Sequence, residues 1–427
     1  MIELFATLKD KSSRKIFQQN CNDVLLVMII ILVPISIKFS NYVIFILAFN
    51  WLIYVISFKE KFYLKNRNSV LINIAPFLIC VLTLLYSKEL IRGLHNIEKL
   101  LPLLAFPVIL NTIDSRKDYT FFLKAFSICI LLMSAICFCY GLYNLIFVDE
   151  NQQVLVGDNF NRVPSRWNAL TNLNLMRPFL INPIYMSLYV SFAVFIVLSE
   201  KFVNGFVKAL LVTFLIIFQF LIGSRIGLFA FFFAIMVFVL QVGNKKRRFY
   251  FSIFASLVFI ASIVIIFLNP VLKKRFVSDL AKLSPPESVE GWNALNIRLA
   301  IWNCSWKVFK QSPILGYGIK DHEAVRAACY QEEYTFHGPY GTRLNSHNQF
   351  IEFALVGGPL LLGLFVAQLV YSARIAIANG AKLHLIFISI FAITCCGESL
   401  LETQKGIVFF ALFNSVFIYY NRKESNV

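Results

Sequence analysis

Charged residues are scarce in this sequence. They make up 15% of its 427 residues, whereas 58% are hydrophobic. This composition excludes an ordinary soluble domain, in which about a quarter of the residues are charged. The apolar residues gather in repeated runs close to the roughly 20 residues that a membrane-spanning helix requires. With a mean hydropathy of +0.70, the sequence predicts a polytopic membrane protein, and its 45 phenylalanines fit a lipid-facing surface.

Histidine is rare as well, with five residues. Of the nine cysteines, the seven outside the long polar loop do not stand at metal-ligand spacing from a histidine. We therefore expect no bound metal and no cofactor. The Gly316-Tyr317-Gly318 segment lacks the strand and helix that flank a nucleotide-binding glycine loop, so it is more typical of a turn. Cys304 and Cys329 both fall in one long polar loop. They form a disulfide if that loop lies in an oxidising compartment, and two free thiols are the alternative.

No cleavable signal peptide is evident, because the first apolar run ends without a small-residue cleavage pattern, and we expect it to be a retained helix. The sequence predicts an all-α fold with about twelve transmembrane helices. Internal repeats are absent, so we expect one membrane-embedded domain over residues 1–427. A large helical periplasmic loop, residues 269–346, lies within it between helices 9 and 10. The apolar runs are 24–37, 42–58, 69–86, 100–112, 119–147, 182–199, 206–222, 226–242, 249–268, 347–373, 383–397 and 406–421.

The formal net charge of +17 would indicate a nucleic-acid partner in a soluble protein. Here much of the excess lies in short loops between apolar runs, such as 245–248, and the positive-inside rule explains it without nucleic acid. The distribution predicts that both termini are cytoplasmic and that the loop 269–346 is extracytoplasmic.

This orientation brings polar groups from distant parts of the sequence to the same outer face. A catalytic site assembled over a helix bundle requires such a gathering. The residues expected there include Lys99, Arg177, Arg225, Arg298, His347, Glu398, Glu402 and Gln404.

Arg225 and Arg298 are the candidates for holding a phosphate group. The planar guanidinium bonds two oxygens at once and does not lose its proton, and two arginines match the two negative centres of a diphosphate. Arg225 lies in a tight turn between two apolar runs. The alternatives are that Arg225 extends to lipid headgroups and that Arg298 belongs to a solvated helix face.

His347 begins the tenth apolar run, and histidine is the side chain best suited to proton transfer near neutral pH. The alternative is a histidine that packs at the start of a helix. Glu398 and Glu402 are four residues apart. They pair with the arginines or bind acceptor hydroxyls; the alternative is that they belong to a plain outer loop between two spans. Residues 293–310 are expected to be helical, with Arg298 and Trp302 on one face, and 322–334 to form a second short helix.

Taken in order, these motifs resemble the O-antigen ligase and polymerase superfamily, which are membrane glycosyltransferases of the GT-C type. The resemblance covers roughly residues 75–420. The matching segments are Ile97–Pro107, Pro183–Tyr189, Ser224-Arg225-Ile226-Gly227, Arg298-x-x-x-Trp302, Pro313–Gly318 and His347-Asn348-x-Phe350, followed by Gly357-Gly358. Asn182 stands where the family usually has a histidine.

The resemblance implies metal-independent transfer of a glycan from undecaprenyl diphosphate at the periplasmic face of the bacterial inner membrane, in lipopolysaccharide biosynthesis. It implies that Arg225 and Arg298 bind the diphosphate and that His347 acts on the acceptor hydroxyl. Attack from the face opposite the leaving group would invert the sugar configuration. The other expected substrate-binding residues are Lys99, Arg177, Tyr185, Asn348, Glu398, Glu402 and Gln404.

The predicted activity is an O-antigen ligase, with lipid A–core as the acceptor. A polymerase that joins lipid-linked repeat units is the alternative, since only the acceptor differs. A transporter or flippase of lipid-linked glycan is a more distant one. It would show charged or broken helices at mid-membrane, often in two related halves.

Overall fold

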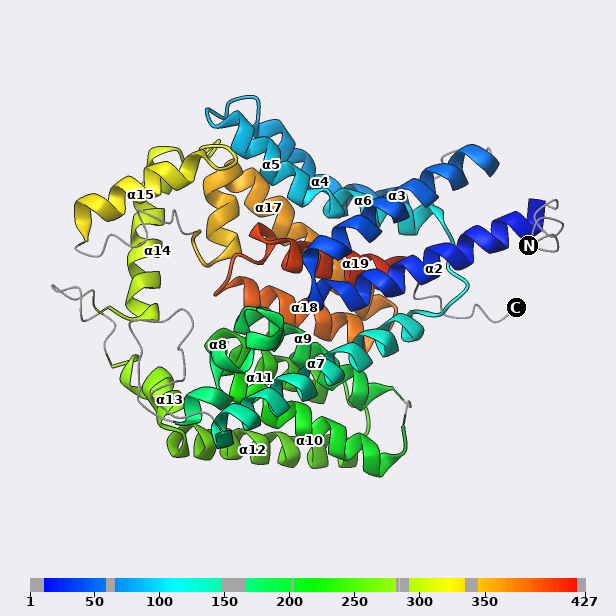
Figure 1. Cartoon of the computed structure of the whole chain (residues 1–427). Helices are drawn as coiled ribbons and strands as arrows, with labels where there is room; N and C mark the ends of the chain where they lie inside the picture. Colours follow the sequence, from blue (N-terminus) through cyan, green and yellow to red (C-terminus); the bar gives the residue numbers. More distant parts are fainter. Residues whose placement is uncertain are drawn as a thin grey trace.

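The computed structural model describes residues 11–58, 66–147, 166–200, 203–281, 284, 292–334 and 345–420. Over these residues the fold is all-α, as predicted, and contains no strand (Figure 1). Its α-helices are α2 (Lys11–Ile35), α3 (Ile37–Phe58), α4 (Arg67–Thr83), α5 (Leu90–Leu100), α6 (Pro102–Thr112), α7 (Tyr119–Phe147), α8 (Asn172–Leu175), α9 (Pro183–Ser199), α10 (Gly205–Ile222), α11 (Arg225–Leu240), α12 (Lys245–Leu268), α13 (Pro270–Lys273), α14 (Ala294–Gln311), α15 (Asp321–Glu333), α17 (Gln349–Ala378), α18 (Lys382–Cys395) and α19 (Gln404–Tyr420). Short 3₁₀ helices are η2 (Arg166–Leu170), η3 (Arg177–Phe179) and η6 (Leu400–Glu402), and η4 (Lys274–Ser278) is a π-helical turn.

Each of the twelve predicted apolar runs falls on a helix. Among the described residues, seven helical segments are long and apolar enough to cross a membrane: 12–35, 37–57, 90–112, 119–147, 205–222, 245–268 and 349–378. Helices α4, α9, α11 and α18 are apolar but shorter. A multi-pass membrane protein is therefore supported, while the count of twelve crossings stays a prediction.

Helices α9, α18 and α19 form the centre of the bundle, and their apolar side chains are almost all buried. Phenylalanine rings from α7, α9, α18 and α19 interlock there, with neighbouring centroids 4.9–5.7 Å apart. The expectation of a lipid-facing phenylalanine surface therefore holds for only some of the phenylalanines. Exposed rings such as Phe45 and Phe229 fit it, whereas Phe126 and Phe192 are core residues.

The two ends of the bundle differ. Figure 1 shows α13, α14 and α15 at one end, here called the loop end. Helix α2 starts and α19 finishes at the opposite end, here called the terminal end. The hydroxyl of Tyr420 accepts from the amide of Asn22 (3.3 Å) and donates to the carbonyl of Ile113 (3.2 Å).

The long loop is helical, as predicted. Helix α14 starts after Asn293, whose side chain accepts from the backbone N–H of Asn296 (3.2 Å), while the Asn296 side chain accepts from the N–H of Asn293 (2.7 Å). A disulfide between Cys304 and Cys329 joins α14 to α15, with Cα atoms 5.8 Å apart. The structure thus selects the disulfide over two free thiols.

Helix α17 is broken at Gly357 and Gly358, where the backbone leaves the helical region and Gly358 has a φ of 64°. The break receives the Pro313–Gly318 turn: the N–H of Tyr317 donates to the carbonyl of Leu355 (2.8 Å), and the N–H of Gly318 to that of Val356 (2.9 Å). A Cβ at Gly358 would lie 2.0 Å from the Ile314 carbonyl oxygen. The glycine-rich segment is therefore a turn, as expected, and it attaches the loop to α17.

Candidate active site

Arg225 is placed by a sharp turn between two apolar helices. Gly223 ends α10 in the left-handed conformation (φ 65°), and the Ser224 side chain caps the start of α11, so Arg225 becomes the first residue of α11. Its Nε and Nη2 donate to the backbone carbonyl of Arg275, the former at 2.9 Å, and Nη2 also pairs with the carboxylate of Asp279. These contacts fix the guanidinium at the loop end.

The glycine of the Ser-Arg-Ile-Gly motif brings α11 against α9. A Cβ at Gly227 would lie 1.9 Å from the Ser187 hydroxyl oxygen. The buried Gln219 amide donates to the hydroxyls of Ser187 (2.6 Å) and Ser191 (3.0 Å), which ties α10 to α9. The turn that carries Arg225 is thus held on two sides.

Arg298 lies on α14, with a side chain 20% exposed, and its Nη2 is 3.7 Å from Oε2 of Glu398. Burial lowers the pKa of Arg298, the carboxylate of Glu398 opposes that shift, and the positive charge of Arg225 adds to it. The two arginines are therefore within electrostatic reach of each other. An anion between them would relieve this repulsion.

Both arginines line a cleft of about 170 Å³ at the loop end. Arg275, Ser224 and Asn182 line it as well. Arg225 pairs with Asp279 and Arg298 with Glu398, and the three guanidinium groups together concentrate positive charge at the cleft, which suits an anion. The sequence did not predict Arg275 as a site residue.

His347 takes the left-handed conformation (φ 48°), which is uncommon for a residue with a side chain. Its N–H donates to Oδ1 of Asn345 (3.1 Å), and its Nδ1 is 3.2 Å from Oε2 of Glu398. Since Arg298 pairs with the same oxygen, Glu398 connects His347 to Arg298. The imidazole is 24% exposed and thus accessible to a substrate.

The backbone on either side of His347 is anchored to other elements. Trp302 lies on α14 one turn after Arg298, and its indole N–H donates to the carbonyl of Ser346 (2.9 Å). Helix α14 therefore holds the segment of the loop that comes directly before His347. On the other side, the Asn348 carboxamide accepts from the N–H groups of Phe350 (3.0 Å) and Ile351 (3.1 Å) and caps α17. Its Nδ2 donates to a backbone carbonyl of the turn after α18 (3.0 Å).

A family model described as O-antigen ligase matches residues 209–366, from the start of α10 to the middle of α17. This part of the chain is therefore similar to the O-antigen ligase family. The matched region contains Arg225, Arg298 and His347, and it is narrower than the resemblance found in the motifs. A comparison with curated proteins finds no match to the chain.

The matched region also contains a buried ionic cluster that the sequence did not reveal. Glu352, in the first turn of α17, accepts from Nε2 of His322 (2.6 Å), from Nη1 of Arg326 (3.2 Å) and from the N–H of Ser346 (2.8 Å). The three ionisable side chains are at most 1% exposed. The cluster therefore fixes the residue next to His347 and joins α15 to α17.

The other predicted binding residues divide into two groups. Tyr185 accepts from the Thr403 hydroxyl (2.6 Å), and Glu402 pairs with Lys320 rather than with the cleft arginines. Lys99, Arg177 and Gln404 lie on α5, η3 and α19. In the part of the chain that the structure describes, these three neither line the cleft nor contact Glu398 or His347.

Oxygens of Glu323, Glu352 and Glu402 lie within 4.8 Å of one another, close enough for a cation. Positive side chains already neutralise them: Lys320 pairs with Glu323 (2.9 Å) and with Glu402. The arrangement therefore favours an ion-pair network over a metal site.

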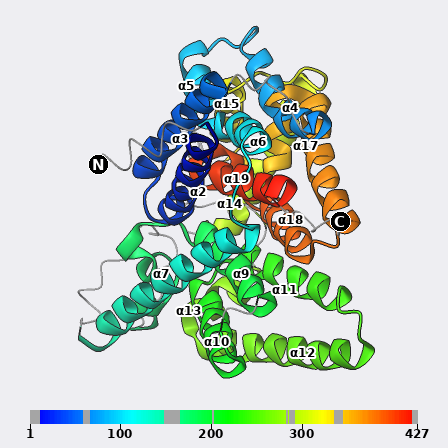
Figure 2. The same cartoon turned by 90° about the vertical axis from the view of Figure 1, so that its right-hand side faces the viewer.

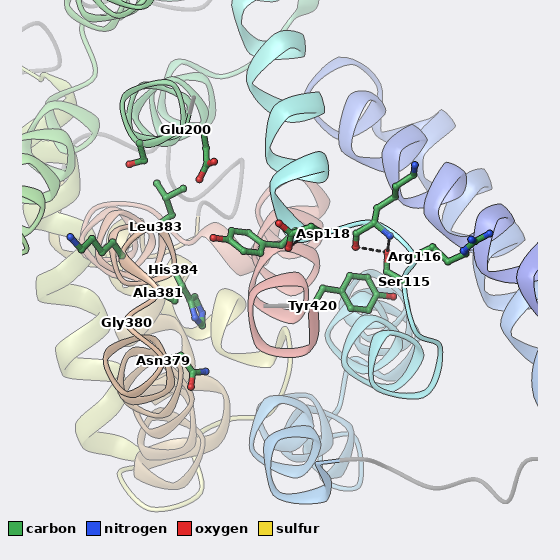
Figure 3. Close-up of a pocket in the computed structure, with 14 residues that line it drawn as sticks. Ser115, Arg116, Asp118, Glu200, Asn379, Gly380, Ala381, Leu383, His384 and Tyr420 are labelled. Atoms are coloured by element: carbon green, nitrogen blue, oxygen red, sulfur yellow. Dashed lines mark hydrogen bonds between the residues drawn. The ribbon is translucent and has the colours of Figure 1, made fainter. Parts of the chain in front are cut away.

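A larger cavity, about 760 Å³, lies at the terminal end (Figure 3). Asp118, Glu200, His384 and Tyr420 line it, and Nε2 of the buried His384 is 3.0 Å from Oδ1 of Asn414. None of the predicted catalytic residues lines this cavity. The arginine cleft, although smaller, is therefore the candidate active site.

Proposed function

We propose that the protein transfers an O-antigen or related polysaccharide from undecaprenyl diphosphate to lipid A–core at the periplasmic face, without a metal and with inversion. One observation carries the proposal. The cleft formed by Arg225 and Arg298 is joined, through the single carboxylate of Glu398, to a partly exposed histidine. Anion binding and proton transfer are thus adjacent.

In the proposed reaction, the acceptor hydroxyl oxygen forms a bond to the anomeric carbon of the donor sugar. The bond from that carbon to the diphosphate oxygen breaks, and its electron pair stays with the diphosphate. The hydroxyl proton passes to Nε2 of His347, because Nδ1 faces Glu398. Glu398 stabilises the imidazolium that forms and keeps the ring oriented.

Arg225 and Arg298 stabilise the charge that develops on the leaving diphosphate. Preorganisation makes such donors effective, since they need not reorient as the charge appears. The contacts of Arg225 with Asp279 and the Arg275 carbonyl supply this rigidity. A diphosphate needs no proton to leave, so the mechanism requires no carboxylic acid of the glycosidase kind.

The proposed orientation has two supports. The Cys304–Cys329 disulfide fits an oxidising compartment and thus a periplasmic loop end. The basic stretch 245–248 starts α12 at the other end, where the positive-inside rule expects the cytoplasm. A lipid tail would then extend from the cleft along the bundle.

A polymerase that joins lipid-linked repeat units remains the second candidate, because ligases and polymerases share the donor chemistry. The family match is compatible with both. The acceptor alone distinguishes them.

A reconstituted assay tests the proposal. Purified protein is mixed with undecaprenyl-diphosphate glycan, with and without lipid A–core, beside a His347→Ala variant. Product on lipid A–core that the variant fails to make supports the ligase. A ladder of longer lipid-linked glycans without lipid A–core supports the polymerase, and the absence of both products with intact substrates contradicts glycosyl transfer.

A further inference from the structure

An open apolar groove lies between the first turns of α10 and α12, near the end of α9. Its volume is about 410 Å³. Both views of the bundle show α10 and α12 along one edge (Figures 1 and 2). Only 11% of the apolar window of α12 is buried, against 50% for α7, so this helix presents most of its surface to lipid.

The walls and the mouth of the groove differ in chemistry. Ala209 and Val212 of α10 face Phe251 and Phe254 of α12 along its length. The mouth carries two cations, Lys208 and Arg247, and none of the lining residues that the structure describes is acidic. Both cations lie in the first turn of their helices, at the level where lipid headgroups begin if these helices span the membrane.

We propose that this groove binds an anionic glycerophospholipid of the leaflet at the terminal end, with an acyl chain between α10 and α12 and the phosphate between Lys208 and Arg247. This site is separate from the arginine cleft and does not depend on the proposed transfer reaction. Basic pockets between transmembrane helices are suited to anionic headgroups.

The ammonium of Lys208 is positioned for this role. It donates to the carbonyls of Glu200 (2.7 Å) and Leu198 (3.3 Å), which leaves one of its three N–H donors for a phosphate oxygen. The carboxylate of Glu200 is within electrostatic reach of Lys208 but does not line the groove.

Charge around the mouth favours an anionic over a zwitterionic lipid. Lys245, Lys246 and Arg248 flank Arg247, and all four side chains are exposed. The Nε of Arg248 donates to the carbonyl of Val242 (2.9 Å), which holds this basic turn in place. A zwitterionic headgroup would bring a second cation into this positive field, whereas a net negative headgroup would not.

The test uses the full-length protein, delipidated in a neutral detergent. Palmitoyl-oleoyl phosphatidylglycerol and the phosphatidylcholine with the same chains are added separately, and bound lipid is counted by native mass spectrometry. We expect the wild type to retain phosphatidylglycerol preferentially. Lys208→Gln and Arg247→Gln should each weaken its binding roughly fivefold, the effect expected for one interfacial cation.

Two further variants separate the groove from general electrostatics. Ala209→Trp fills the groove and should reduce binding of both lipids while leaving the charge unchanged. Arg374→Gln removes an exposed cation at the same end of the bundle, on α17, and should change nothing.

Equal retention of the two lipids by the wild type would overturn the proposal. Unchanged phosphatidylglycerol binding in Ala209→Trp, or an equal loss in Arg374→Gln, would do so as well. A dimer in the wild type that Ala209→Trp abolishes would show that a second copy of the chain, and not a lipid, occupies the groove.

Discussion

Glu398→Gln tests the link between the arginine cleft and the histidine. Oε2 of Glu398 is 3.2 Å from Nδ1 of His347 and 3.7 Å from Nη2 of Arg298. Glutamine keeps the size of the side chain and one acceptor oxygen, but it removes the negative charge. The 7% exposed site gives water little room to replace that charge.

The magnitude follows from these two contacts. A hydrogen bond that involves a charged group contributes about 1.5–3 kcal/mol, roughly twice a neutral one. The longer contact with a 20% exposed arginine adds at most about 1 kcal/mol. A loss of about 2–3 kcal/mol in the transition state corresponds to a roughly 30- to 150-fold fall in kcat/KM.

The assay is the reconstituted transfer reaction, with kcat and the donor KM measured separately. The loss should fall mainly on kcat, because Glu398 orients the base and stabilises the imidazolium. Glu333→Gln is the matched control, since Glu333 pairs with Lys307 on the exposed outer surface of α15 and α14. A Glu398→Gln variant with kcat within threefold of the control would refute the proposed relay, and so would a loss confined to the donor KM.

Four other outcomes are expected. Arg225→Ala and Arg298→Ala should each lower the transfer rate strongly. Arg225→Lys and Arg298→Lys should restore only part of that rate, because lysine lacks the planar guanidinium fork; full recovery would mean that charge alone suffices. Transfer should continue in EDTA, and a loss that a divalent cation reverses would contradict the metal-free mechanism. Gly358→Ala should lower stability by at least about 2 kcal/mol in detergent unfolding, whereas Gly363→Ala, with no atom within 4 Å of the added Cβ, should be neutral or stabilising by up to about 1 kcal/mol. Cys304→Ser should cost about 3 kcal/mol of loop stability, measured as protease resistance, and an unchanged cleavage rate would exclude a structural role for the disulfide.

Much of the fold follows from local sequence. Apolar runs predicted the positions of the bundle helices because burial and lipid exposure both require apolar side chains over the length of a span. The boundaries of α14 and α15 were predicted within one residue. Asn293 and Asn296 cap the start of α14, and Pro313 follows its end, so these limits are encoded within a few residues of each other.

The missed features are contacts between distant segments. Asp279 holds Arg225, and Arg275 joins the same cleft, but neither is marked by spacing from Arg225. The cluster of Glu352 with His322 and Arg326 brings α17 against α15 across residues 334–345. Such pairings depend on how the loop folds back onto the bundle, and no local periodicity encodes that.

The residues of the short motifs nevertheless make the contacts that hold the loop against the bundle. Trp302, one turn after Arg298, holds the carbonyl of Ser346, and Glu352 holds the N–H of the same residue. The Pro313–Gly318 turn docks into the Gly357–Gly358 break of α17. Trp302 and Glu352 thus hold the residue before His347, and the Pro313–Gly318 turn fixes the loop to α17; together these contacts place His347 beside Glu398. We infer that the spacing of these motifs maintains the distance between the anion cleft and the histidine. No single residue of the motifs would be enough to do so.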